Sequence, residues 1–112
     1  MADYSKYIWH NSKIIPWEEA KIHVMSHVLH YGSGVFEGIR CYDTAMGPQI
    51  FRLDDHINRL FTSAKAYKMN VQASKESIID GCKEIVKAND LRESYIRPVS
   101  YTHLTLPTNR EV

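Results

Sequence analysis

Hydrophobic and polar residues change their spacing several times along this chain, and the first change predicts a β-hairpin. Tyr7–Trp9 and Lys13–Ile15 contain aromatic and β-branched residues, which favour strands. Between them lies His10–Ser12, whose Asn and Ser are typical of a tight turn. Pro16 cannot donate a ladder hydrogen bond and is expected to end the second strand. The pattern therefore predicts a β-hairpin within Lys6–Trp17.

Three further segments have the character of strands. Val35–Tyr42 is largely apolar with β-branched and aromatic members, which predicts one buried strand. Ala45–Pro48 contains a Gly-Pro pair, which marks a turn. Gln49–Arg52 then predicts a strand that can pair with the first, and Ser94–Pro98 predicts another.

Two segments show a helical period instead. The first helix is expected to begin at Asp54 or Asp55, either of which can cap it. Its apolar stripe comprises Ile57, Leu60, Phe61, Ala64 and Tyr67. Ser74 is expected to cap the second helix, Glu76 favours its first turn, and Asn89–Asp90 ends it. Its stripe comprises Ile78, Ile79, Cys82, Ile85 and Val86.

The order of these elements indicates the fold class. Strands come first, two helices follow, and a strand returns at the end. Such an order predicts an α+β domain in which two helices pack on one face of a mostly antiparallel sheet. We find no internal repeat and no linker, so a single small domain is expected.

Composition narrows the classes of function. The 112 residues are 44% hydrophobic and 24% charged, which is typical of a globular protein, and the net charge of +1 gives no field to attract nucleic acid or an anionic membrane. Cys41 and Cys82 have no zinc-site spacing and read as buried free thiols. Without a signal peptide or a run of membrane-spanning length, we expect a cytoplasmic protein.

The stretch from His23 to Tyr42 concentrates the candidate chemistry. A short helix is expected within Lys21–His30 and stops at Gly32. His23, His27 and His30 would share one face of a continuous helix and could hold a metal. No carboxylate or cysteine lies at ligand spacing, so we favour structural histidines and predict no metal. The turn Tyr31–Gly34 lacks the P-loop pattern and better suits close approach of the backbone to a ligand or subunit.

Two arginines carry alternative readings. Arg59 follows Asp55 by four positions, so spacing alone favours a surface ion pair over a phosphate site. Tyr95 and Arg97 alternate with Ile96 along a strand and therefore point to one face. That pair suits carboxylate recognition or an ordinary solvated sheet face.

The texture changes after Pro98. Residues 99–112 show weak patterning and no continuation of the domain. The string from Val99 to Thr108 resembles one reading frame of the transposon-end adapter of sequencing libraries, and Asn109–Glu111 would be a translated sample index. We expect 99–112 to be a non-native tail and exclude it from functional reasoning.

Together, residues 1–98 resemble the N-terminal small domain of bacterial branched-chain amino-acid aminotransferases, which are fold-type IV pyridoxal-phosphate enzymes. The resemblance is carried by five blocks of sequence, which are Tyr7–Trp9, Ala20–His27, Leu29–Tyr42, His56–Leu60 and Tyr95–Pro98. It implies that Arg59 binds the phosphate of pyridoxal 5′-phosphate. It also implies that substrate is bound by four residues, which are Tyr31, Phe36, Tyr95 and Arg97.

The reaction implied is transfer of an amino group between leucine, isoleucine or valine and 2-oxoglutarate, in a homo-oligomer built from dimers. In the family, the Schiff-base lysine lies in a C-terminal domain, beyond this chain, and Lys83 and Lys87 match no catalytic position. We therefore expect no catalytic residue here and no activity of the chain alone. D-Amino-acid aminotransferases and aminodeoxychorismate lyases, which share the fold, and a histidine-based metal-binding module are the alternatives.

Overall fold

A computed structural model describes residues 5–102, and its first element is the predicted hairpin. Strand β1 (Tyr7–His10) pairs antiparallel with β2 (Lys13–Pro16), and a short 3-10 helix, η1 (Trp17–Glu19), follows. Asn11 and Ser12 both have positive φ, as a two-residue turn between twisted strands requires. The prediction for Lys6–Trp17 is confirmed.

The remaining strands form two further sheets. Strand β3 (Gly34–Phe36) pairs with β7 (Val99–Tyr101), and β4 (Ile39–Thr44) lies between β5 (Gly47–Ile50) and β6 (Ser94–Ile96). All of these pairs are antiparallel, in agreement with the predicted sheet type. The sequence pattern placed the second strand of the β4–β5 hairpin two residues too late. It predicted Gln49–Arg52, whereas β5 begins at Gly47 and ends at Ile50.

The predicted strand over Val35–Tyr42 is interrupted, and so is its partner. Phe36 lies opposite Val99, and Ile39 lies opposite Ile96, so one antiparallel register runs through both pairs of strands. At the break, the Glu37 N–H donates to the Pro98 carbonyl at 3.1 Å. Pro98 has no N–H to return the bond, which explains why the ladder stops there and resumes. We call these four strands, β3, β4, β6 and β7, the ribbon.

Part of the segment set apart from the sequence as a tail lies in this ribbon. Val99–Tyr101 forms β7, and the Thr102 N–H donates to the Ser33 carbonyl at 3.1 Å in the same register. The structure thus places the residues that directly follow Pro98 against β3. The non-native origin of 99–112 stays a prediction, and residues 103–112 lie outside the described part of the chain.

The two long helices are those that the apolar stripes predict, with one error at a cap. Helix α2 (Leu53–Ala66) begins after Arg52, whose backbone is left-handed and whose side chain makes no capping bond, so neither Asp54 nor Asp55 is the N-cap. Both aspartates lie in the first turn, where their negative charges interact favourably with the helix dipole. Helix α3 (Lys75–Ala88) is capped as predicted, because the Ser74 hydroxyl accepts from the Ser77 N–H at 3.1 Å.

The predicted helix within Lys21–His30 is much shorter than expected. Helix α1 (His27–Tyr31) has five residues and ends at Gly32, whose φ is +66°. Ser26 precedes it with extended backbone, and the Ser26 N–H donates to the His23 carbonyl in a separate turn. His23 therefore does not share a helix face with His27 and His30, and the helical premise of the metal reading was wrong.

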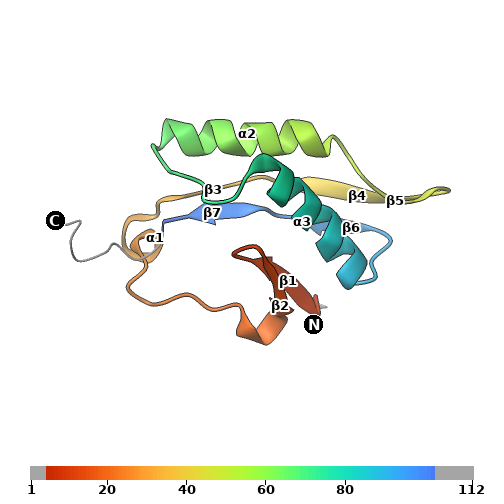
Figure 1. The fold of residues 1–112 in the computed structure, drawn as a ribbon, viewed down its shortest axis with the longest axis horizontal. Helices are drawn as coiled ribbons and strands as arrows, with labels where there is room; N and C mark the ends of the chain where they lie inside the picture. The colour runs from red at the N-terminus through yellow and green to blue at the C-terminus, as the bar shows by residue number, and fades with distance from the viewer. Residues whose placement is uncertain (1–4, 103–112) are drawn as a thin grey trace.

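The core lies between the helices and one face of the ribbon. Figure 1 shows α2 running along the strands, with α3 next to it and the β1–β2 hairpin beside α3. One buried cluster comprises Ile39, Leu53, Ile57, Ile78 and Cys82, and a second comprises Val35, Leu60 and Ala64. Tyr67, placed on the stripe by its spacing, is instead the exposed C-cap of α2. The predicted α+β fold is confirmed.

Trp9 joins the hairpin to α3 at a glycine. An added Cβ at Gly81 would lie 2.6 Å from the Trp9 ring atoms Cε2 and Nε1. A glycine inside a helix costs stability relative to alanine, so its presence here reflects the space that the indole occupies.

Among residues 5–102, no helix is long and apolar enough to cross a membrane.

Candidate functional site

The two faces of the ribbon differ because side chains alternate along a strand. Val35, Glu37, Ile39 and Cys41 are buried beneath the helices, while Phe36 and Arg40 face outward and are exposed. Glu37 is the one charged residue in this buried row and is only 6% exposed. A buried carboxylate needs charged or hydrogen-bonding partners, so the surroundings of Glu37 are the first candidate region.

Both partners of Glu37 come from α2. Arg59 donates from Nε to Oε2 at 2.9 Å and from Nη2 to Oε1 at 2.8 Å, which is a two-pronged guanidinium–carboxylate pair. His56 Nδ1 lies 2.9 Å from Oε1. An ionised carboxylate has no proton to give, so Nδ1 is the donor. One turn of helix thus supplies two donors to one buried acid.

The position of Arg59 excludes the ion pair with Asp55 that helical spacing favoured. Asp55 pairs with Arg52 at 2.8 Å, so the expected surface pair between Asp55 and Arg59 is not formed. The Arg59 side chain is 68% exposed, and within residues 5–102 its Nη1 has no hydrogen-bond partner. Arg59 therefore presents one edge of its guanidinium to Glu37 and keeps donors for a ligand.

The charges of this cluster support one another. The hydrogen bond from Arg59 holds the pKa of the Glu37 carboxyl below its usual value, against the opposing effect of burial, and His56 acts in the same direction. Glu37 in turn raises the pKa of Arg59. Glu37 is therefore ionised at neutral pH.

This depressed pKa predicts a loss of stability in acid. The folded-state pKa of Glu37 lies below the unfolded value, so its contribution is present above the unfolded pKa and is lost as pH falls through the folded pKa. When the pH is lowered below about 4.5, we expect the urea concentration at the unfolding midpoint to decrease. The decrease should be smaller for Glu37→Gln. An equal fall in both proteins would contradict the assignment.

The exposed face of the ribbon carries the second candidate region. The Arg97 guanidinium lies 4.6 Å from the centre of the Phe36 ring and 5.5 Å from that of Tyr95. Its Nη2 donates to the Tyr95 hydroxyl at 3.3 Å. A Cβ at Gly38 would collide with that hydroxyl, so the phenol lies directly over this glycine. The predicted pair, Tyr95 and Arg97, does share a face.

Tyr31 is placed differently. It lies at the end of α1 and is 73% exposed, and its ring contacts within residues 5–102 are with His27 and His30. Of the five predicted site residues, the structure therefore joins Phe36, Tyr95 and Arg97 on the open face. Arg59 lies on the helix side, and Tyr31 lies on its own.

The three histidines each have a hydrogen-bond partner, local for His23 and His30 and distant in sequence for His27. His23 Nδ1 accepts from the Met25 N–H, His27 contacts the Thr102 hydroxyl, and His30 contacts the Val24 carbonyl. Within residues 5–102, no group of three metal-ligating side chains comes together. These rings hold the loop around α1, which is what a structural role requires.

Sequence reasoning missed Glu37 and His56 as members of the site. A signal for them exists, because Glu37 is the one acid among alternating apolar residues, and His56 and Arg59 are three apart on a helix. A buried acid that faces two hydrogen-bond donors on a neighbouring element is a reason to expect a specific ion pair.

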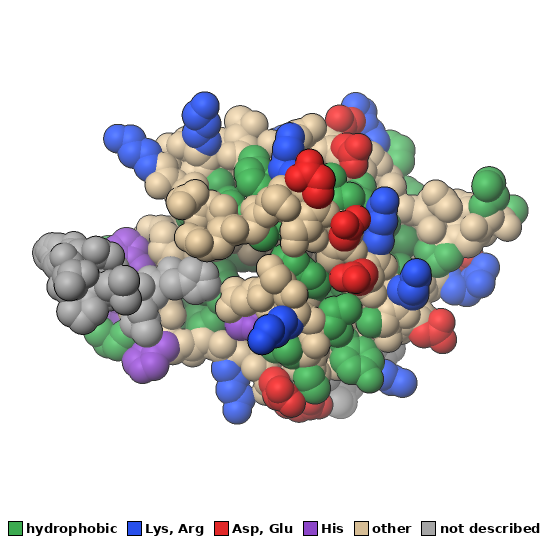
Figure 2. Space-filling view, in the orientation of Figure 1, with side chains coloured by type: hydrophobic (Ala, Val, Ile, Leu, Met, Phe, Trp, Pro, Cys, Tyr) green, Lys and Arg blue, Asp and Glu red, His purple; other side chains and the backbone are tan. Residues whose placement is uncertain are grey.

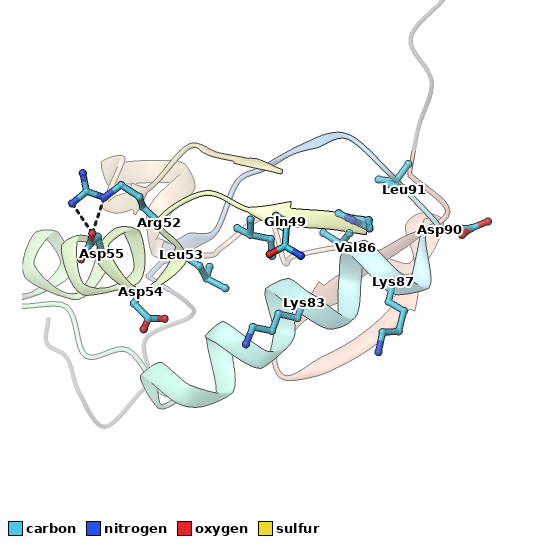
Figure 3. A pocket seen from close by; sticks show the side chains of 12 residues that line it. Gln49, Arg52, Leu53, Asp54, Asp55, Lys83, Val86, Lys87, Asp90 and Leu91 are labelled. Carbon is cyan, nitrogen blue, oxygen red and sulfur yellow. Dashed lines mark hydrogen bonds and ion pairs between the residues drawn. The ribbon is translucent and has the colours of Figure 1, made fainter. Parts of the chain in front are cut away.

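A groove among the described residues lies elsewhere. It measures about 840 Å³ and lies between β5, the start of α2 and α3, where Lys83 and Lys87 line it (Figure 3). It contains none of the predicted site residues. Charges of both signs are interspersed over the face shown in Figure 2, so this face has no single-sign field for a polyanion.

Comparison with known proteins decides the family. The model of amino-transferase class IV matches residues 34–105, which is more than half of the 112 residues. The chain belongs to the class IV aminotransferases. The matched region contains the whole ribbon, both long helices and four of the five predicted site residues.

Relatives within this family are branched-chain enzymes. The class IV chain is 48% identical over 95 residues to the branched-chain-amino-acid aminotransferase of Escherichia coli K12, covering 85% of this chain and 31% of that one. Two crystal structures of the branched-chain amino acid aminotransferase from T.th. superpose on it. The complex with N-(5′-phosphopyridoxyl)-L-glutamate has a TM-score of 0.85 at 47% identity, covering 87% and 32% of the two chains. The complex with 4-methylvaleric acid has a TM-score of 0.88 at 45% identity, covering 94% and 37%. The chain thus spans about a third of these relatives.

Proposed function

We propose that this chain supplies the small N-terminal domain of a branched-chain amino-acid transaminase. The reaction moves an amino group between leucine, isoleucine or valine and 2-oxoglutarate, with pyridoxal 5′-phosphate as cofactor. The observation that carries the proposal is the pairing of an exposed aromatic and cationic cluster with family membership. Phe36, Tyr95 and Arg97 lie together on the open face of the ribbon of a class IV aminotransferase.

The cofactor fits the donors that the chain presents. A phosphate needs charged donors with free N–H groups, and Arg59 keeps Nη1 available while Glu37 holds the other edge. Arg59 would therefore hold the cofactor phosphate. When bound, the cofactor acts as the electron sink of the reaction, and the protein contributes orientation and electrostatics. The T.th. relative in complex with a phosphopyridoxyl-glutamate supports this choice of cofactor.

The binding site must accept two different substrate side chains, one branched and apolar and the other acidic. Phe36 and Tyr95 supply apolar wall for a branched side chain, and the role of Tyr31, which lies apart from them, rests on the resemblance alone. Arg97 can pair with the acidic side chain of glutamate by its guanidinium fork, while its contact with aromatic faces keeps it next to that wall. The relative's complexes with a glutamate adduct and with 4-methylvaleric acid contain one ligand of each kind.

The resemblance places the family's Schiff-base lysine in a C-terminal domain, outside the segment that residues 1–98 resemble. Lys83 and Lys87 line the separate groove and match no catalytic position of the family. We therefore propose that the chain alone does not turn over substrate and acts within a dimer-based assembly that carries the second domain. The dimer-based assembly and the cytoplasmic location stay predictions.

A chimera tests the proposed function. Residues 5–98 replace the aligned segment of the E. coli relative, which supplies the remaining two thirds of the enzyme. We expect transamination of leucine with 2-oxoglutarate within about tenfold of the parent, because the fold is shared. A folded, cofactor-loaded chimera without leucine turnover would sink the proposal.

The chain alone provides the complementary measurement. With pyridoxal 5′-phosphate, leucine and 2-oxoglutarate, we expect no turnover and no visible absorbance band that borohydride reduction fixes at one lysine. A stoichiometric band of that kind, together with turnover, would show that this chain carries its own catalytic lysine.

A further inference from the structure

We propose that Glu37 is a positioning residue, which fixes the Arg59 guanidinium so that its Nη1 side faces an incoming phosphate. The inference rests on the proposed role of Arg59. It goes beyond that role because it assigns a task to a buried carboxylate whose side-chain partners are His56 and Arg59. Its basis is the geometry of Glu37, His56 and Arg59.

Glu37 is well suited to act as a fixed anchor. Its backbone is held where the ribbon is interrupted, by the bond from its N–H to the Pro98 carbonyl. Its neighbours in the buried row, Val35 and Ile39, are in the core. A carboxylate with an immobile backbone and a 6% exposed side chain has little freedom to follow a moving partner.

Arg59 needs such an anchor. It lies on the flank of α2 between the buried residues Ile57 and Leu60, but its own side chain is 68% exposed. A long exposed arginine samples many rotamers and loses that freedom when it binds a ligand. Two bonds to Glu37 remove this freedom in advance, so the phosphate meets a preorganised donor.

His56 completes the anchor. Its Nδ1 contacts Oε1, so the carboxylate has donors from two side chains of α2. The His56 side chain is only 19% exposed, which limits its own movement. Both carboxylate oxygens are thereby engaged by donors from α2.

A competing effect gives the proposal its test. Glu37 carries a negative charge, and removing it would by itself strengthen the attraction of Arg59 for phosphate. The exposed guanidinium is strongly screened by solvent, so this gain is small. The cost of reordering one long side chain corresponds to about three- to tenfold in affinity, and we expect it to dominate.

The experiment follows the Arg59 Nε–H resonance of the full 112-residue chain by NMR. The probe is pyridoxamine 5′-phosphate, and pyridoxamine, which lacks the phosphate, is the reference. In the wild-type chain, we expect a single exchange-protected Nε–H that persists when the phosphate probe binds. A disordered Nε–H, or one released from Glu37 on binding, overturns the proposal without any variant and so does not depend on how variants fold.

Glu37→Gln provides the second arm. We expect it to lose the protection of Nε–H and to bind the phosphate probe about three- to tenfold more weakly, with pyridoxamine binding unchanged. Asp43→Asn is the matched control. Asp43 pairs with Arg92 at 2.8 Å, and this pair does not involve Arg59. Equal or tighter phosphate binding by Glu37→Gln overturns the inference alone. A wild-type Arg59 that gives no response to phosphate overturns the role of Arg59 as well.

Discussion

Replacing Arg59 by alanine in the chimera is expected to weaken binding of pyridoxal 5′-phosphate by about 100-fold. Each charge-assisted hydrogen bond contributes about tenfold in affinity, and the free edge of Arg59 can make two such bonds to a phosphate. The effect is specific to the phosphate, because Arg59 lies on the helix side of the ribbon and away from the cluster around Arg97. Affinity is measured by equilibrium dialysis followed by absorbance of the bound cofactor.

Two comparisons make this result specific. Pyridoxal, which lacks the phosphate, should bind the Arg59→Ala chimera as well as it binds the parent chimera. Arg92→Ala removes another exposed arginine that is paired with a carboxylate, and should leave both affinities unchanged. If Arg92→Ala weakens cofactor binding as much as Arg59→Ala does, general charge and not a phosphate contact is responsible.

Gly81→Ala is expected to lower the free energy of unfolding by about 1 kcal/mol, and by about 2 kcal/mol at most, although alanine is the better helix former. The helical preference favours alanine by about 1 kcal/mol, whereas a side chain forced into a packed space costs about 1–3 kcal/mol. The added Cβ would lie 2.6 Å from the Trp9 indole, so the clash is with a ring that is packed against the core. Urea unfolding followed by circular dichroism measures the difference.

A double-mutant cycle isolates the indole as the cause. In a Trp9→Leu background, the smaller side chain leaves room for the new methyl group, and Gly81→Ala should become neutral or stabilising. A penalty of the same size in both backgrounds would mean that α3 itself, and not its contact with the hairpin, disfavours alanine.

Local signals in the sequence predicted the secondary structure well where side-chain chemistry is local. Ser74 caps α3 through its own hydroxyl, and the turn at Asn11–Ser12 uses residues that tolerate positive φ. Both features depend on neighbouring residues alone. The N-terminus of α2 is different, because Arg52 adopts a left-handed conformation without any capping bond. An arginine in that position gives no signal that a sequence pattern can detect.

The candidate site depended on contacts between distant residues. Alternation placed Tyr95 and Arg97 on one face, and the structure agrees. The partner of Arg59 was not found by spacing, because the nearest acid along the helix, Asp55, pairs with Arg52. The true partner, Glu37, is 22 residues away and reaches Arg59 only when α2 packs on the ribbon. Tertiary packing thus pairs Arg59 with a distant acid instead of the one that helical spacing favoured.

The unbroken register of the ribbon makes residue parity a constraint on its length. Along β3 and β4, odd-numbered residues such as Ile39 and Cys41 lie beneath the helices, while even-numbered ones such as Arg40 face outward, on both sides of the interruption opposite Pro98. Inserting or deleting one residue there would exchange the two sets beyond the interruption, and would drive Arg40 under the helices. Changes of two residues would keep the phase. The ribbon can therefore lengthen or shorten only in even steps if its buried and exposed faces are to keep their residues.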